Sequence, residues 1–274
     1  MKNNISFFIP AYNCEGFIEE AVHSIMKTNF IDGDELVICD DCSTDNTPAV
    51  LESLRCQYPQ IKVVRHLYNH GGPVARNTAI LNTTNDILFC LDSDNVLSDN
   101  SIEILKDYMI SKNVEAAAFG EVKYFHKDQP KENTSHSWFW KYPVFDRSNV
   151  LSTIYFPGSS GNYMFTRHCW EMVGGYLPNM RTLDTWTFGF RQVMEGFPIA
   201  ILKGTYYYHR YGMNSNYMRN GNKYNHSLMA LSAAAPYMKQ FRRKDIWYIF
   251  GLGRYKWVDN LEKHPIWLKE EVQE

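Results

Sequence analysis

The sequence predicts an α/β fold built on an open, mostly parallel sheet flanked by helices. Through the first 115 residues, short apolar runs alternate with segments in which apolar residues recur at helical spacing. Strands that are joined by helices need crossover connections and therefore pair in parallel. From about residue 116 this alternation fades. We therefore expect a mixed sheet in the second half and a short helical extension at the C-terminal end.

The individual elements follow from the same patterns. Strands are expected at Ile5–Ile9, Glu35–Cys39, Ile61–Val64, Asp86–Leu91, Ala116–Phe119, Val122–Phe125 and Thr205–Tyr208. Helices are expected at 17–25, after Asn46, at Pro73–Leu81, after Ser98, at Asp184–Gly196, at Asn225–Tyr237 and at Ile246–Phe250. Asp45 or Asn46 can cap the second helix, and Pro48 suits its first turn because no N–H is needed there.

The composition is that of an ordinary globular protein with an excess of aromatic rings. Hydrophobic residues make up 45% and aromatic residues 15% of the 274 residues. The formal net charge of −2 gives no electrostatic reason to expect nucleic acid as a partner. Many rings follow residue 124, and we expect them either to fill a core or to form a surface on which sugars stack. They include Trp138, Phe139, Trp140, Tyr142, Trp170, Trp186 and Tyr206–Tyr208.

The six cysteines are expected to be reduced, which fits a cytoplasmic protein. Cys39 and Cys42 have the spacing of a zinc or redox pair, but no second Cys or His pair lies at a matching distance. The first expected strand begins at Ile5, which leaves no room for a signal peptide, and no apolar run is long enough to span a bilayer. Membrane contact is therefore expected to be peripheral at most, with the aromatic residues of 247–257 as the candidate contact.

Polar loops follow the four expected strands of the first half. They are Pro10–Asn13, Asp40–Asp45, Asn69–Arg76 and Asp92–Asn95. Ligands of open α/β sheets bind at the carboxyl ends of the parallel strands. The sequence therefore predicts that these loops meet at one edge of the sheet and form the site.

Two acidic residues in the last of these loops predict a metal site. Asp92-Ser93-Asp94 comes directly after the strand that ends at Leu91. Two carboxylates one residue apart can share a hard divalent cation, and oxygen ligands select Mg²⁺ or Mn²⁺. Such a cation would bridge a diphosphate and offset the charge that develops on a leaving nucleotide. The alternative is a solvated acidic turn, which the position at the end of a strand makes the less favoured interpretation.

The other three loops supply a candidate pocket for a nucleotide. The Asp41 carboxylate can accept a hydrogen bond from a pyrimidine N3–H, and the Tyr12 ring, which follows Pro10 and Ala11, can stack on the base. Arg76 lies one helical turn after two glycines, and both helix N-termini and arginine favour phosphate oxygens. The glycine spacing is not that of a dinucleotide-binding loop, which disfavours a dinucleotide fold.

Four short motifs occur in order over about ninety residues: Phe8–Asn13, Asp40–Thr47, Gly71–Asn77 and Leu91–Asp94. Together they resemble family 2 glycosyltransferases of the GT-A fold. The resemblance implies inverting transfer of a sugar from a nucleotide-diphosphate donor. Asp41 and Tyr12 favour UDP-sugars, and the aromatic second half suits a hydroxyl of a glycan or glycolipid as the acceptor. The resemblance also implies Mn²⁺ or Mg²⁺ as the cofactor. The donor contacts that it implies are Pro10, Ala11, Tyr12, Asp41, Arg76, Asp92, Ser93 and Asp94.

The second half carries a looser match to the same family. Gly174-Gly175-Tyr176 and the later Asp184 are similar to the family's Gly-Gly-Tyr and to an acidic pair before a helix. The family usually has Glu-Asp at that pair, where this chain has Leu183 before Asp184. The resemblance implies that Asp184 is the base that deprotonates the acceptor hydroxyl, although a helix N-cap fits its position equally well. Trp186 is a candidate acceptor contact, and His209 is a candidate third metal ligand.

These assignments divide the chain into a donor-binding half at 1–115, an acceptor-binding half at 116–225 and a helical C-terminal extension at 226–274. Two other classes of protein share some of the features. A nucleotidyltransferase would share the sheet and the metal, but it should have a basic Gly-rich loop where this chain has Pro10–Asn13. A non-catalytic protein that binds a sugar nucleotide or a glycan is favoured by Leu183 alone.

Overall fold

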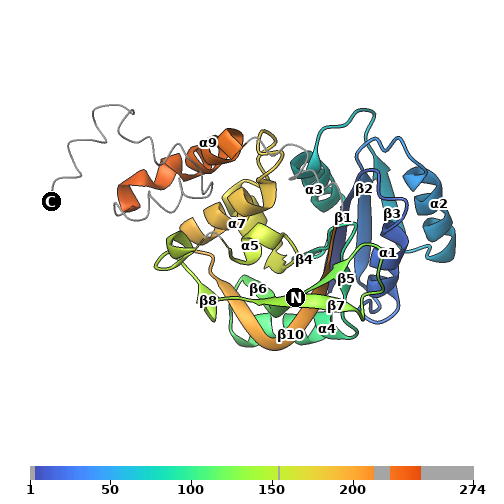
Figure 1. Ribbon diagram of the computed structural model, residues 1–274, viewed down its shortest axis with the longest axis horizontal. Helices are drawn as coiled ribbons and strands as arrows, with labels where there is room; N and C mark the ends of the chain where they lie inside the picture. The colour runs from blue at the N-terminus through green and yellow to red at the C-terminus, as the bar shows by residue number, and fades with distance from the viewer. Residues whose placement is uncertain (1–3, 154, 213–222, 242–274) are drawn as a thin grey trace.

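The computed structural model of the protein describes residues 4–153, 155–212 and 223–241 (Figure 1). The strands are β1 (Ile5–Ala11), β2 (Glu35–Asp40), β3 (Ile61–Arg65), β4 (Ile87–Cys90), β5 (Val96–Leu97), β6 (Ala116–His126), β7 (Thr134–Phe139), β8 (Val144–Phe145), β9 (Met164–Thr166) and β10 (Ile199–Tyr211). The α-helices are α1 (Ile18–Met26), α2 (Thr47–Gln57), α3 (Gly72–Leu81), α4 (Ser101–Ser111), α5 (Pro157–Ser160), α6 (Arg167–Val173), α7 (Asp184–Met194) and α9 (Lys223–Ala234). The 3-10 helices are η1 (Val150–Ser152) and η2 (Ala235–Gln240).

All of these strands belong to one sheet, which confirms the predicted fold class. The order along the sheet is β3-β2-β1-β4-β9-β6-β10-β5, with β7 beside β6 and β8 beside β10. Strands β1 to β4 pair in parallel, as the alternation of strands and helices predicts. The sheet becomes mixed at β9, which runs antiparallel to both β4 and β6, and β10 then pairs in parallel with β6. The sheet is thus continuous across the expected boundary at residue 115.

Helices cover both faces of the sheet, and each face has its own apolar core. Alternate residues of β1 point to opposite sides, so that Phe8 belongs to one core while Phe7 and Ile9 belong to the other. Helices α3, α6 and α7 contribute to the core around Phe8, and helices α1, α2 and α4 contribute to the other. Figure 1 shows α3, α5 and α7 on one side of the strands and α4 on the opposite side.

Two strands of the second half are longer than the sequence predicts. Ala116–Phe119 and Val122–Phe125 are parts of the single strand β6, and Thr205–Tyr208 is the middle of β10. The pairing of these strands shifts register after Leu202. A Cβ on Gly120 would lie 2.7 Å from the carbonyl oxygen of Leu202. Gly120 therefore interrupts the apolar pattern without ending the strand, because it lets the two backbones approach closely.

The described part of the C-terminal extension is helical, as expected. The helix predicted at Asn225–Tyr237 is α9 followed by η2. The hydroxyl of Tyr237 donates a 2.6 Å hydrogen bond to Glu195 just after α7. The helix expected at Ile246–Phe250 and the aromatic residues of 247–257 lie outside the described residues. Within the described ranges, no helix combines the length and the apolar character that crossing a bilayer requires.

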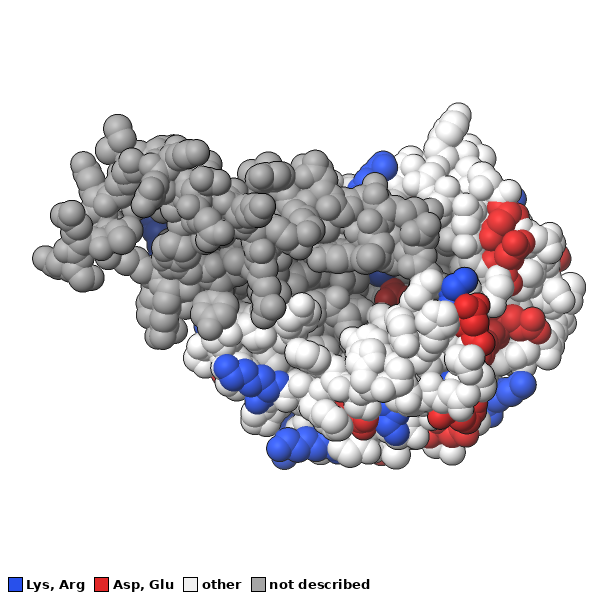
Figure 2. All heavy atoms as spheres, viewed as in Figure 1, with Lys and Arg blue, Asp and Glu red and all other residues white. Residues whose placement is uncertain are grey.

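Charged side chains of both signs are present on the face of the molecule drawn in Figure 2. On that face, Lys and Arg side chains are dispersed among Asp and Glu and do not form a continuous basic patch. This distribution agrees with the formal net charge of −2. A basic face of the kind that binds the phosphates of nucleic acid is therefore absent from this view of the described residues.

Helices α5 and α7 cross with their backbones in contact. A Cβ on Gly189 would lie 2.5 Å from the Cα atom of Gly158, and a Cβ on Gly158 would lie 2.8 Å from the Cα atom of Gly189. Side-chain atoms of any size would push the two helices apart. The crossing therefore fixes the position of α7, whose first residue is Asp184.

We expect Gly189→Ala to destabilise the protein by about 1–3 kcal/mol, because the added methyl group overpacks the crossing. This cost should exceed the roughly 1 kcal/mol by which alanine favours a helix over glycine. Gly16→Ala is the control, since a Cβ there would have nothing within 4 Å. Urea unfolding would measure both free energies, and equal stability of the two variants would contradict the close crossing.

Candidate active site

Three of the four predicted loops lie side by side at the carboxyl edge of the sheet. Strand β1 is between β2 and β4, and Ala11 at its end pairs with Asp40 at the end of β2. The Asp41 N–H donates a 2.8 Å hydrogen bond to the Ala11 carbonyl. On the other side, the N–H of Leu91, at the start of the loop after β4, donates a 3.2 Å hydrogen bond to the Phe8 carbonyl of β1. The loops after β1, β2 and β4 therefore form one rim.

The loops after β1 and β2 are held together by hydrogen bonds between backbone and side chains. The N–H of Asn13 donates to the Ser43 hydroxyl at 3.0 Å, and the Asn13 side-chain oxygen accepts from the N–H of Thr44 at 2.8 Å. The Thr47 hydroxyl, at the start of α2, accepts from the N–H of Cys14 at 2.8 Å. Tyr12 lies in this loop with 39% of its surface exposed. Its ring is thus available at the rim for the predicted stacking on a base.

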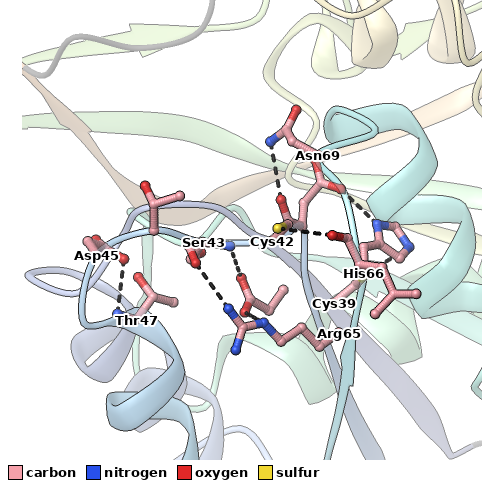
Figure 3. A network of polar contacts seen from close by, with 12 residues as sticks. Cys39, Cys42, Ser43, Asp45, Thr47, Arg65, His66 and Asn69 are labelled. Carbon is pink, nitrogen blue, oxygen red and sulfur yellow. Dashed lines mark hydrogen bonds and ion pairs between the residues drawn. The ribbon is translucent and has the colours of Figure 1, made fainter.

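Figure 3 shows the second of these loops between helix α2 on one side and His66 and Asn69 on the other. Arg65 supports it from β3, because its guanidinium donates to the Ser43 carbonyl at 3.1 Å. Cys42 has a φ of 63°, in the left-handed region, which turns the chain between the two sides. Burial and the two neighbouring aspartates raise the pKa of Cys39 to about 12. The thiol of Cys39 is therefore protonated at neutral pH, which disfavours a redox role for the Cys39–Cys42 spacing.

Asp41 joins this rim to the loop that precedes α3. Its carboxylate accepts hydrogen bonds from the N–H groups of His70 at 2.9 Å and Gly71 at 2.7 Å. The Nδ1 atom of His66 lies 2.7 Å from one of its oxygens. A carboxylate offers about four acceptor positions. These contacts fix the orientation of the Asp41 carboxylate, which is only 2% exposed. Its contact with a pyrimidine N3–H stays a prediction.

Arg76 bridges two carboxylates that are far apart in the sequence. Its guanidinium donates to Asp92 at 2.6 Å and also pairs with Asp184 at the start of α7. Burial alone would lower the pKa of Arg76, but Asp184 and Asp92 outweigh burial and raise that pKa well above its usual value. A Cβ on Gly72 would lie 2.8 Å from the guanidinium. The second glycine of the loop therefore makes room for the ion pair.

Asp184, which the sequence analysis predicts to be the catalytic base, is buried at this bridge. Burial raises the pKa of its carboxyl, and the neighbouring Arg76 only partly offsets this effect. The residue also begins α7, so its charge faces the positive end of the helix dipole. Leu183 just before it is 9% exposed and belongs to the apolar core. Where the family usually has an acid, this chain thus has a side chain that packs inward.

Asp92 has both of its carboxylate oxygens engaged. One oxygen accepts from Arg76, and the other accepts from the side-chain amide of Asn162 at 3.0 Å. The Asn162 side-chain oxygen also accepts from the backbone N–H of Asp92 at 2.8 Å. Asn162 is only 1% exposed. It is a site residue that the sequence analysis does not identify, because its role depends on β9 lying beside β4.

Asp94 differs from Asp92 because it takes part in no ion pair between described residues. Burial and repulsion from Asp92 raise the pKa of Asp94 to about 7. Its backbone carbonyl accepts a 3.0 Å hydrogen bond from Arg210, which also pairs with Glu20 of α1. Arg210 therefore fixes the loop while the carboxylate stays available. It too was not among the predicted site residues.

The two acids fit a hard divalent cation. Asp92 lies close enough to help raise the pKa of Asp94, and a cation would relieve that repulsion. The described residues contain no group of three or more His, Cys, Asp or Glu side chains placed to hold a metal. Mg²⁺ commonly binds through one or two carboxylates together with phosphate oxygens and water. Asp94, with Asp92 beside it, would be the protein's contribution to such a site.

Among the described residues, His209 does not form a three-residue metal site with Asp92 and Asp94. Burial lowers the pKa of His209, and Asp92 acts in the opposite direction. Its Nδ1 atom is buried without a hydrogen-bond partner among the described residues. The role of His209 as a third metal ligand stays a prediction.

Trp186 lies in the core and not on an open surface. Its exposed fraction is 5%, and its ring stacks on Phe190 with centroids 5.0 Å apart. The predicted acceptor contact at Trp186 is therefore not supported, because both the turn of α7 and the packing of Phe190 direct the ring inward. The helical spacing of Trp186 and Phe190 is that of a core pair.

A large open sheet with an acidic rim at the ends of its parallel strands defines a protein of the GT-A type. The chain belongs to glycosyl transferase family 2, whose model matches residues 6–171. Chondroitin synthase of Pasteurella multocida is 28% identical over 173 residues, which cover 63% of this chain and 17% of that protein. This chain thus corresponds to a small part of that relative. The Escherichia coli UDP-Glc:alpha-D-GlcNAc-diphosphoundecaprenol beta-1,3-glucosyltransferase WfgD is 32% identical over 110 residues, or 40% of this chain and 42% of WfgD.

Solved structures show the same fold at low sequence identity. S. aureus TarS in complex with UDP has a TM-score of 0.69 and 17% identity, and the match covers 97% of this chain and 77% of that chain. The mannosyltransferase PcManGT from Pyrobaculum calidifontis, in complex with GDP-Man and Mn²⁺, has a TM-score of 0.62 and 17% identity, with 91% and 69% covered. These likenesses establish the GT-A fold of the chain.

We expect Asn162→Ala to lower the free energy of unfolding by about 1–3 kcal/mol, because it leaves the N–H and one carboxylate oxygen of Asp92 without partners. Asn133→Ala is the control, since Asn133 is exposed and its side chain contacts only exposed Gln129 among the described residues. The control should change stability by less than about 0.5 kcal/mol. Urea unfolding measures both variants. A loss no larger than that of the control would contradict the role of Asn162.

Proposed function

We propose that the protein transfers a sugar from a nucleotide-diphosphate donor, with UDP-sugars favoured, to a hydroxyl of a glycan or glycolipid acceptor. The transfer is cation-assisted and inverts the anomeric centre. The observation that carries the proposal is the Arg76 bridge, which brings the candidate base Asp184 next to the acidic pair that would face the diphosphate. The candidate base, a positive charge and the candidate cation ligands thus lie together at the ends of the strands.

The choice of donor draws on the chain's relatives as well as on the rim. TarS was crystallised with UDP and with UDP-GlcNAc, and the name of WfgD describes it as using UDP-Glc. PcManGT was crystallised with GDP-Man and Mn²⁺. In this chain the exposed ring of Tyr12 and the carboxylate of Asp41, held by the N–H groups of His70 and Gly71, lie at the same rim, which suits a pyrimidine base. We therefore favour UDP over a purine nucleotide.

The reaction proposed for these residues is a single displacement. Asp184 accepts the proton of the acceptor hydroxyl while the oxygen of that hydroxyl forms a bond to the anomeric carbon. The bond between the anomeric carbon and the diphosphate oxygen breaks, and the nucleoside diphosphate leaves from the opposite side of the sugar. A divalent cation held by Asp94 would offset the charge on the diphosphate. Arg76 adds a fixed positive charge, because its own pKa keeps it protonated.

The raised pKa of Asp184 is consistent with the role of base. A carboxylate with an ordinary pKa is a weak proton acceptor at neutral pH, and burial brings this pKa closer to the working pH. The same burial requires a partner, because an unpaired buried charge is costly. Arg76 supplies that partner in the absence of substrate.

The proposed acceptor also bears on where in the cell the protein acts and on its contact with a membrane. The acceptor in the name of WfgD is a diphosphoundecaprenol-linked sugar, and a lipid-linked acceptor would bring this chain to a membrane surface from the cytoplasmic side. We keep peripheral contact through residues 247–257 as part of the proposal.

Asp184→Asn should reduce sugar transfer by about 10²–10⁴-fold, because the amide has the same shape but cannot accept the proton. Asp107→Asn, on the exposed face of α4, is the control and should keep full activity. The readout is the release of UDP from UDP-Glc and UDP-GlcNAc in the presence of Mn²⁺ and a mixture of acceptors. Unchanged turnover in folded Asp184→Asn, judged by circular dichroism, would remove Asp184 as the base.

UDP should raise the melting temperature of the protein in the presence of Mn²⁺ and not in the presence of EDTA, because the cation links the diphosphate to Asp94. Asp94→Asn should lose most of this shift while its own stability in the absence of ligand stays near that of the wild type, since Asp94 makes no ion pair among the described residues. A thermal-shift assay measures both. Stabilisation by NAD(P), or an equal UDP shift in EDTA, would contradict the proposal.

A further inference from the structure

A face of the sheet beyond the acidic rim is formed by aromatic and imidazole rings. The register aligns His209 of β10, Tyr124 of β6 and His136 of β7 in one row across three strands. The centroids of Tyr124 and His209 are 4.9 Å apart, and the rings of Tyr124 and His136 are stacked with centroids 4.5 Å apart. Every residue of β7 is exposed, so the row ends at an open edge.

The row continues along β7 to a second pair of rings. Trp138 follows His136 by two residues and therefore lies on the same face of the strand. Its ring contacts Tyr155, with centroids 5.1 Å apart. Trp138 is 42% exposed and Tyr155 is 54% exposed. We call the surface made by Tyr124, His136, Trp138, Tyr155 and His209 the aromatic shelf.

On β6 and β10, the opposite face is covered near the end of these strands. Arg210 and Phe125 lie on that face in contact with each other, and Arg210 also packs on the ring of Phe17 just before α1. On the shelf side, by contrast, Trp138 and Tyr155 stay exposed to solvent.

Two connections lead from the aromatic shelf to the candidate active site. At one end of the shelf is His209, and the N–H of the next residue, Arg210, donates a 3.1 Å hydrogen bond to the side chain of Asn95, directly after Asp94. At the other end is Tyr155, which begins the segment 155–162 that includes α5. This segment ends at Asn162, which holds Asp92 through two hydrogen bonds. A ligand that lies on the shelf would thus reach the reacting groups without leaving the protein surface.

We propose that the aromatic shelf binds the acceptor glycan, with the C–H faces of its pyranose rings stacked on Trp138 and Tyr155. This inference rests on the proposed function and adds to it the surface that selects the acceptor. Exposed flat rings such as those of Trp138 and Tyr155 suit the apolar C–H face of a sugar. The geometry places the chain of sugars across β7, with its reacting end directed toward His209 and the acidic rim.

The test uses the full chain and three neutral tetrasaccharides: cellotetraose, chitotetraose and maltotetraose. Saturation-transfer NMR should detect contact between the ring C–H protons of at least one of them and the wild-type protein. Trp138→Ala and Tyr155→Ala should each weaken that binding by about 3- to 10-fold, the effect of losing one ring contact. Both side chains are exposed, so we expect the fold to be retained, and circular dichroism checks this.

Phe139→Ala is the matched control. Phe139 follows Trp138 on β7, points to the other face of the strand and is 65% exposed. Its loss should change tetrasaccharide binding by less than 2-fold. An equal loss in the Phe139 and Trp138 variants, or no binding of any tetrasaccharide to the wild type, would overturn the inference. The inference would also be overturned if Trp138→Ala weakened binding to phosphatidylcholine and phosphatidylglycerol vesicles but left tetrasaccharide binding unchanged. That result would make the shelf a membrane contact.

A separate readout distinguishes failure of the shelf from failure of the proposed function. The Mn²⁺-dependent thermal shift with UDP does not involve Trp138 or Tyr155 and should be the same in their variants as in the wild type. If UDP stabilises every variant but no glycan binds, the shelf is wrong and the transferase proposal stands. If UDP stabilises none of them, the transferase proposal itself is wrong, and with it the acceptor role of the shelf.

Discussion

The ion pairs of Arg76 with Asp92 and Asp184 are the interaction on which the candidate site depends. Arg76 comes from α3, Asp92 from the loop after β4 and Asp184 from α7, so the bridge joins both halves of the chain. All three groups are wholly or largely buried, and breaking a buried pair typically costs about 3–5 kcal/mol because a charge is left without its partner. The bridge therefore fixes the distance between the cation site and the candidate base.

The bridge also gives the two acids of the rim different roles. Each carboxylate oxygen of Asp92 accepts a hydrogen bond, one from Arg76 and one from Asn162, and these contacts hold Asp92 in the framework of the site. Asp94 is held through its backbone by Arg210 and keeps its carboxylate available. The side chains that hold the donor loop thus come from β10 and from the segment before β9. For this reason the second half of the chain contributes to the donor site as well as to the aromatic shelf.

The first half of the fold could be predicted from the sequence because its signals are local. Apolar strands, helical spacing and polar loops at strand ends were sufficient to place Asp41, Asp92 and Asp94 at one rim. The partners of Arg76 could not be predicted, because both are set by packing between distant elements. Asn162 was missed for the same reason, since its contact with Asp92 requires β9 to pair with β4. Helical spacing indicated α7 correctly but did not reveal that Trp186 points into the core.

Strand β7 was missed because it has no buried face. Its sequence, Thr134 to Phe139, is exposed throughout and carries no alternation of apolar and polar residues. The excess of aromatic residues pointed to a sugar-binding surface in the second half, but composition alone could not separate rings that fill the core from rings that face solvent. That distinction needed the register of β6, β7 and β10.

The central claim is that a cation on Asp94 and the charge of Arg76 together hold the diphosphate of a nucleotide next to Asp184. A crystal structure with UDP and Mn²⁺, collected at a wavelength where manganese scatters anomalously, tests it most directly. The account predicts an anomalous peak bound by the Asp94 carboxylate and by diphosphate oxygens, with the uracil ring on Tyr12. A peak remote from the loop after β4, or a nucleotide bound away from this rim, would contradict it.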